Sequence, residues 1–129
     1  MTSWIIAIDK NYPEHWQIAV EHGFWNMTQD RPIEPNHDVY FWQSSKGLLG
    51  HVQADSDTDA LRLGTDKPWL DAGVRRYRFR FDFQLVSTTP LAQPRWSEVA
   101  AATGIRQSLQ SGVVATQDPD AETWLKEKF

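Results

Sequence analysis

The 129-residue chain contains no cysteine, which excludes a disulfide framework and thiolate chemistry. It has no apolar run approaching the ~20 residues that a membrane-spanning helix needs, and its first ten residues lack a signal-peptide cleavage site. Its net charge of −4 argues against a broad, salt-driven grip on duplex DNA. Glycine-rich phosphate loops and a nucleophile elbow are also absent. These absences predict a cytoplasmic, non-enzymatic protein that acts through one localised pocket, away from the membrane.

Metal sites receive little support from the residues. His15 and His22 are spaced near two helical turns, but no third ligand stands nearby, and a zinc site needs at least three protein ligands. Residues 55–59 imitate the start of a calcium-binding loop, yet Ala60 stands where such a loop requires glycine and Asp66 replaces the bidentate glutamate. We therefore expect neither a metal ion nor a cofactor.

Tryptophan is abundant. Indole rings are core anchors by default, and each carries an N–H that needs a partner when buried. A small core does not easily hide this many rings, so we expect one or two of them to line a pocket. The seven rings are Trp4, Trp16, Trp25, Trp42, Trp69, Trp96 and Trp124.

The hydrophobic pattern predicts a single α+β domain over residues 1–129, with a mostly antiparallel sheet curled into a small barrel and short flanking helices. The clearest signal is a period of two over residues 75–86, which indicates a strand with one buried face. In chain order we expect a strand (4–8), a helix ending at 23, a loop (24–36), a hairpin (39–44 and 48–54), the long strand (75–86), a helix (97–102), a short strand (113–116) and a terminal helix from 119.

Polar residues and glycines predict where the helices begin and end. Asn11 and Glu14 have capping-box spacing at the start of the first helix, which Gly23 ends. Ser97 is the expected cap of the second helix, which Gly104 ends, and Asp118 followed by proline begins the last one.

Several short motifs follow one another in an order that resembles the EVE domain, a family of PUA-like nucleic-acid readers. The likeness lies in the order and spacing of all the motifs over nearly the whole chain. The chain departs from the family at His37, where a glycine is usual, and in the loop after the first tryptophan–glycine pair, which is shortened to residues 26–28. The motifs are SWIIAID (3–9), GFWN (23–26), HDVYFWQS (37–44), GLLG (47–50), RFDFQLVSTTPLAQPRWSEV (80–99) and IRQSLQ (105–110).

The resemblance implies a PUA-like (EVE) pseudobarrel and a non-catalytic module. Such a module would recognise a modified or flipped base, of the 5-methylcytosine or 5-hydroxymethylcytosine type in DNA or a modified base in RNA. Its partner would be DNA or RNA carrying that base, with a nuclease or other effector acting in trans. The alternative is a small-molecule or protein-interaction domain on the same barrel, which the acidic net charge favours.

Reading one exposed base takes a ring for stacking, donors and acceptors for the base edge, and a cation for the phosphate. Trp25 follows a helix-ending glycine, so its ring either stands at a pocket mouth or packs under the next loop. Trp42 and Ser44 share one face of a strand and form either a base site or a half-buried ring beside a turn serine. The full candidate set is Trp25, Asn26, Trp42, Gln43, Ser44, Arg106, Gln107 and Ser108.

Two basic or polar stretches have similar alternatives. The stretch 106–108 either reads a base edge or is an ordinary polar loop. Arg76, Arg78 and Arg80 would form a stripe on one face of the long strand. That stripe either follows a nucleic-acid backbone or is a solvated face paired with carboxylates.

Overall fold

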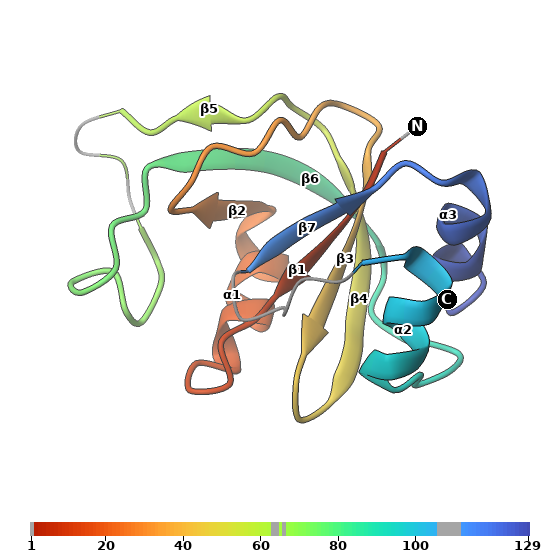
Figure 1. The fold of residues 1–129 in the computed structure, drawn as a ribbon. Coiled ribbons are helices and arrows are strands. Elements are labelled where there is room, and N and C mark those ends of the chain that lie inside the picture. Colours follow the sequence, from red (N-terminus) through yellow and green to blue (C-terminus); the bar gives the residue numbers. More distant parts are fainter. Residues whose placement is uncertain (1, 63–64, 66, 106–111) are drawn as a thin grey trace.

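The computed structural model describes residues 2–62, 65, 67–105 and 112–129, and these residues form a curled sheet with short helices beside it (Figure 1). The helices are α1 (Glu14–His22), α2 (Trp96–Thr103) and α3 (Pro119–Lys126). The strands are β1 (Ser3–Ala7), β2 (Phe24–Met27), β3 (Asp38–Gln43), β4 (Gly47–Ala54), β5 (Asp59–Ala60), β6 (Phe79–Ser87) and β7 (Val113–Thr116). None of the described helices has the length and apolarity to cross a membrane.

The sheet is mixed. The parallel pairing of β1 with β3 brings the C-terminal ends of these two strands together. Among the described residues the strand order is β2-β6-β4-β3-β1-β7, with β5 paired to β6. All of these pairs are antiparallel except β1 and β3, which align Ala7 with Trp42. Parallel strands finish at the same edge of a sheet. The segment after Ala7 therefore lies beside the β3–β4 turn, and the Ile8 amide donates to the Trp42 carbonyl at 2.7 Å.

The long strand β6 curls the sheet. Its first half pairs with β2 on one side and β5 on the other, and its second half pairs with β4. Register shifts occur between Phe41 and Trp42 in the β3–β4 pair and between His51 and Val52 in the β4–β6 pair. Such irregularities increase local twist and bend. In the described strand order β2 and β7 remain the two edge strands, so no ladder joins them.

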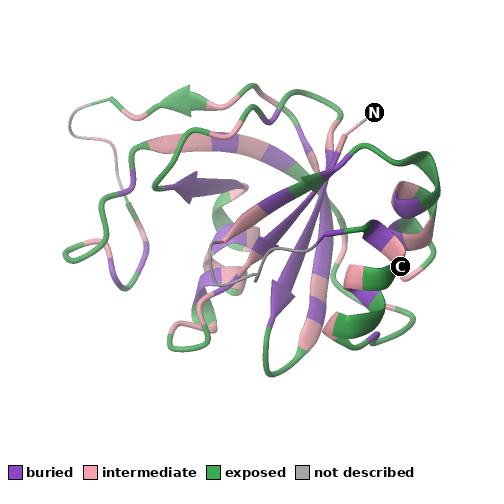
Figure 2. Ribbon diagram, in the orientation of Figure 1, coloured by how far each residue is buried: buried purple, intermediate pink, exposed green. Residues whose placement is uncertain are grey.

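Alternate residues of β3 face two different cores, because side chains alternate along a strand. Val39 and Phe41 belong to the core that α1 covers, whereas Tyr40 and Trp42 belong to a second core with residues of α2 and α3. Figure 2 shows β3 buried along its length. The expected face sharing, with Phe41 in one core and Trp42 on the other face, is confirmed.

Several predicted boundaries are confirmed. The hairpin forms as β3 and β4, and the last short strand forms as β7. Gly23 and Gly104 end their helices with φ of 75° and 72°, in the left-handed region that glycine adopts without steric cost. Asp118 caps α3 by accepting from the Asp120 amide at 3.1 Å.

Other predicted boundaries are wrong. Residues 24–27, expected in a loop, form β2, because they pair with β6 in the register Trp25 with Phe81. The capping box at α1 does not form: Pro13 is the N-cap, and the Asn11 amide donates to Asp9 Oδ1 instead. The second helix begins one residue before Ser97, after an N-cap at position 95.

Candidate functional site

Two adjoining pockets open where β1 and β3 end. The Trp42 pocket, of about 770 Å³, lies between the end of β1, the β3–β4 turn and the segment that leads into α2. The Asn26 pocket, of about 330 Å³, lies between β2, the end of β1 and the start of β7. The two pockets share four residues, Ala7, Asp9, Arg75 and Gly112, and so form one cleft. Both volumes fall in the roughly 300–1,000 Å³ range of small-ligand sites.

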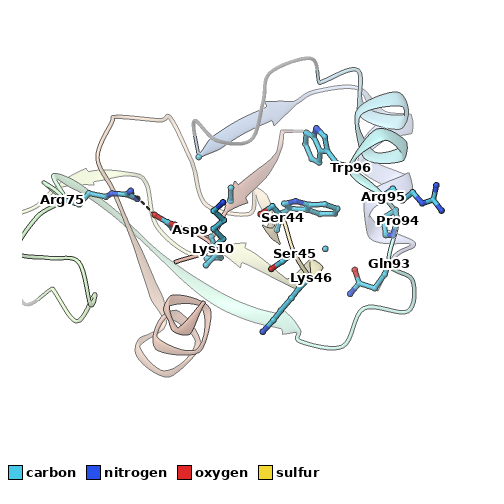
Figure 3. A pocket seen from close by; sticks show the side chains of 15 residues that line it. Asp9, Lys10, Ser44, Ser45, Lys46, Arg75, Gln93, Pro94, Arg95 and Trp96 are labelled. Atoms are coloured by element: carbon cyan, nitrogen blue, oxygen red, sulfur yellow. Dashed lines mark hydrogen bonds and ion pairs between the residues drawn. The ribbon is translucent and has the colours of Figure 1, made fainter. Parts of the chain in front are cut away.

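The Trp42 pocket is lined by aromatic rings and by polar side chains. The Trp42 ring is 5% exposed and lies 5.4 Å, centroid to centroid, from the ring of Trp96, which is only half-buried. Figure 3 shows Lys10 and Ser44 among the side chains that line the pocket, while the Arg95 guanidinium points away from it. The lining therefore includes one partly accessible indole, a cation and a hydroxyl.

Gln93 joins the β3–β4 turn to the segment before α2. Its amide oxygen accepts from the Leu48 amide at 2.9 Å, and its amide nitrogen donates to the Leu48 carbonyl at 2.8 Å. Gly47 adopts φ of 88° in this turn, and a Cβ there would collide with the Gln93 side chain. These contacts join the two sides of the Trp42 pocket.

Asn26 is the unusual residue of the Asn26 pocket. Asn26 is among the residues that line the pocket and is 1% exposed, and neither atom of its side-chain amide has a hydrogen-bond partner among the described residues. A buried polar group without a partner costs about 1–3 kcal/mol. An amide that carries this cost beside a cavity is a place where a ligand can supply the missing hydrogen bonds.

Trp25 also lines the Asn26 pocket. It is 7% exposed, and its ring meets Phe41 and Trp69 edge-on at centroid distances of 5.2 and 4.9 Å. Trp25 thus borders a pocket, but as a buried wall and not as a free ring at the pocket mouth. A ligand can pack against it but cannot be sandwiched by it and a second free ring.

Two lining residues of the Asn26 pocket, His15 and Tyr77, form hydrogen bonds within the protein. His15 Nε2 accepts from the Leu70 amide at 3.1 Å, and Tyr77 donates to Asp71 Oδ1 at 2.9 Å. Burial lowers the pKa of His15, in agreement with an unprotonated Nε2. Burial raises the pKa of Tyr77, and its hydrogen bond to Asp71 raises it further, so the phenol keeps its proton. Both rings are therefore neutral walls at pH 7.

Arg75 stands where the two pockets meet. Its Nη2 lies 3.3 Å from Asp9 Oδ2 and its Nε lies 3.6 Å from Asp71 Oδ2 (Figure 3 draws the Asp9 contact). The Arg75 side chain is 47% exposed, so part of it remains accessible to a ligand.

The cleft is positive although the chain is acidic overall. Its lining includes Lys10, Lys46, Arg31 and Arg75, and Asp9 is the one carboxylate among the described residues that line the two pockets. The whole chain has 13 basic and 17 acidic residues. Clefts lined by one sign of charge concentrate ligands of the opposite sign.

The structure brings four of the candidate base-binding residues to this cleft. Trp25 and Asn26 line the Asn26 pocket, and Trp42 and Ser44 line the Trp42 pocket. Gln43 is buried and lines neither pocket. The candidates Arg106, Gln107 and Ser108 lie outside the described residues.

The arginine stripe does not form one face of a strand. Arg76 and Arg78 precede β6 and are exposed, and only Arg80 lies within the strand. Arg80 packs over the Phe24 ring at 4.0 Å and bonds Asp82 at 3.0 Å. The strand begins at Phe79, later than the expected residue 75, although burial still alternates before it: Tyr77 is buried, and Arg76 and Arg78 are exposed.

Sequence reasoning missed the cations and one ring of the cleft. Lys10, Lys46, Arg75 and Trp96 were not singled out. Lys10 closes the first strand and Lys46 lies in the hairpin turn, which are positions that share a sheet edge only if the two strands are parallel. That pairing, against a mostly antiparallel background, has no signal in local periodicity.

Comparison with known proteins places the fold. No family model matches the chain, and no curated protein matches it in sequence. A variant of ZmASCH from Zymomonas mobilis superposes with a TM-score of 0.61 at 11% identity, covering 96% of each chain. A second ZmASCH variant gives a TM-score of 0.56 at 9% identity, covering 96% of this chain and 94% of that one. A hypothetical protein from Leishmania major gives 0.57 at 11% identity, covering 99% and 94%.

The fold is thus a PUA-like barrel, here a curled half-barrel sheet with short helices, as expected from the sequence. Two of the three solved structures it resembles are variants of ZmASCH. At 11% identity and below, this likeness concerns the fold alone.

Proposed function

We propose that the chain is a non-catalytic nucleic-acid-binding module that takes a flipped or modified base into the Asn26 pocket, as the resemblance to EVE domains implies. The single observation that carries the proposal is the buried Asn26 amide, which has no partner among the described residues and borders a cavity. The positively charged lining of the cleft that the two pockets form also supports this proposal.

The Asn26 amide has the chemistry of a base reader. An asparagine side chain presents a donor and an acceptor side by side, and it matches a nucleobase edge with two parallel hydrogen bonds. The amide is shielded in the present conformation, so side chains at the rim must move before a base edge reaches it. Gln29 and Arg31, joined by a 2.7 Å hydrogen bond, line the same pocket, and Gln29 is exposed.

The walls of the Asn26 pocket suit a flat, partly apolar ligand. Trp25, Met27, Ile6 and Tyr77 supply apolar and aromatic surface around the amide. A methyl-sized substituent on the base would gain only about 1–3 kcal/mol from such a wall. We therefore expect modest discrimination between cytosine and its 5-methyl or 5-hydroxymethyl forms.

The experiment is a binding screen followed by intrinsic tryptophan fluorescence. The probes are single-stranded DNA and RNA decamers with one central cytosine, 5-methylcytosine or 5-hydroxymethylcytosine, and RNA with other modified bases. We expect micromolar binding to at least one probe and a loss of about tenfold or more in Asn26→Leu, because a bidentate base contact is worth about 1–3 kcal/mol. If no probe quenches the fluorescence, or if Asn26→Leu binds as tightly as the parent chain, the proposal is wrong.

The second candidate is a small-molecule or protein-interaction domain, which the net charge of −4 favours. Salt separates the two. Affinity for a nucleic acid falls steeply as salt rises, because phosphate contacts release counterions, whereas affinity for a neutral ligand does not. A cytoplasmic location and an effector nuclease acting in trans accompany the first candidate.

A further inference from the structure

The proposed function uses the smaller pocket and leaves the larger one without a role. We propose that the Trp42 pocket is a second subsite, which binds the phosphate and the ring of the nucleotide next to the base held in the Asn26 pocket. The ligand is then a two-nucleotide segment of a single or locally opened strand, and not an isolated base. This inference rests on the proposed function.

Charge favours a phosphate in the Trp42 pocket. Lys10 comes from the segment after β1, Lys46 from the β3–β4 turn and Arg75 from the loop before β6, yet all three line the same 770 Å³ cavity. Ser44 and Ser45 add two exposed hydroxyls to the same lining. Ammonium, guanidinium and hydroxyl groups are the usual protein partners of phosphate oxygens.

Trp96 favours a second ring in the same pocket. It is half-buried, whereas Trp42 behind it is 5% exposed, so Trp96 presents the accessible indole surface of this cavity. A base stacks on an aromatic side chain with little regard to its identity. The neighbouring nucleotide would therefore be held without being read.

The Asp9–Arg75 ion pair marks the boundary between the two subsites. Both residues line both pockets, and their charged groups lie 3.3 Å apart. A phosphate that links nucleotides in the two pockets must pass this boundary, where it competes with Asp9 for the guanidinium. Asp9 then opposes binding, and neutralising it should tighten the complex.

The test uses the decamer that binds best in the screen, together with a version whose phosphate next to the read base is replaced by a neutral methylphosphonate. The double variant Lys10→Ala/Lys46→Ala is compared with Arg76→Ala/Arg78→Ala, which removes the same charge from exposed side chains outside the two pockets. All four residues are exposed, so these variants should fold.

We expect the Lys10→Ala/Lys46→Ala variant to bind the decamer about tenfold more weakly and the control to bind within about threefold of the parent chain. The methylphosphonate is placed in turn on each side of the read base. At one of these positions it should weaken binding by the parent chain by a similar factor, and it should have little further effect on binding by the lysine variant. Such non-additivity identifies groups that interact. Asp9→Asn should bind about two- to fivefold more tightly, the scale of one exposed ion pair. The Asp9→Asn variant also retains the side-chain oxygen that accepts from the Asn11 backbone amide.

The outcomes separate the two proposals. Equal losses in the lysine variant and in its control, with Asn26→Leu still defective, would overturn the second subsite and leave the base pocket standing. Loss in the lysine variant with full binding by Asn26→Leu would keep an anion subsite and overturn the base pocket. Weaker binding by Asp9→Asn would overturn the competition at Arg75.

Discussion

Asn26→Leu should make the protein more stable while removing its capacity to bind a base. The parent chain places two amide atoms in a shielded position, without a partner among the described residues. Each such group costs about 1–3 kcal/mol, and leucine is a branched apolar side chain of similar shape that leaves no polar atom behind. Taking the low end for each atom, the substitution should raise the free energy of unfolding by about 2 kcal/mol. At about 3 °C per kcal/mol for a chain of this length, the melting temperature should rise by about 6 °C.

Tyr40→Phe is the matched control for this prediction. The Tyr40 hydroxyl is likewise buried without a partner among the described residues, but it lies in the core under α2 and α3 and lines neither pocket. Its ring stacks on His51 at 4.4 Å, and phenylalanine preserves that contact. This variant should gain about 1 kcal/mol of stability and bind the chosen decamer as the parent chain does.

The assay for both variants is thermal unfolding followed by circular dichroism, together with the fluorescence titration. A lower melting temperature for Asn26→Leu would show that the amide is satisfied in the folded protein and would refute the physical argument. A higher melting temperature with unchanged binding would show that the amide is not the group that reads the ligand. Increased stability in both variants, with binding lost only in Asn26→Leu, is the expected pattern.

Two further predictions concern the fold. Gly50→Ala should cost about 1–3 kcal/mol in urea unfolding, because its Cβ would collide with the Trp16 ring, whereas Gly73→Ala, with nothing within 4 Å, should be nearly neutral; equal effects would contradict this. Asp38→Asn should cost about 2 kcal/mol at pH 7, since Asp38 accepts from His51 at 2.8 Å in a buried site. Burial alone would raise the pKa of Asp38, but the hydrogen bond and charge of His51, with a nearby lysine ammonium, outweigh burial and hold it below its ordinary 3.8. The ionised carboxylate therefore stabilises the fold above about pH 4, and the difference between the two chains should shrink as the pH falls through the lowered pKa; a difference that does not shrink as the pH is lowered would refute this assignment.

Local features of the sequence correctly predict most of the elements. The β3–β4 hairpin, the left-handed glycines at 23 and 104 and the cap at Asp118 are recognisable because each depends on residues within a few positions of one another. The opposite orientations of Phe41 and Trp42 follow from the period of two. These features are local, so a single sequence is sufficient to predict them.

The failures occur where a distant partner decides the local structure. Residues 24–27 carry turn-like neighbours, but hydrogen bonds to β6 make them a strand. Asn26 appears from the sequence as one polar residue in a short loop, and only that strand pairing buries it beside a cavity. Its isolation from hydrogen-bond partners is a property of the packed barrel and has no counterpart in the residue order.

The sequence by itself determined the α+β composition, the hairpin, the helix ends and the position of Trp42 and Ser44 at the end of a strand, whereas it placed Trp25 and Asn26 in a loop. Only the tertiary structure decided that all four residues line one cleft and that Lys10 and Lys46 line it with them. It also decided that the Trp25 and Trp42 rings are buried in the cleft wall. The reason is the parallel pairing of β1 with β3, two strands that have α1 and β2 between them in the chain. Hydrogen bonds between segments so far apart in the chain depend on the whole fold, while periodicity and capping depend only on adjacent residues.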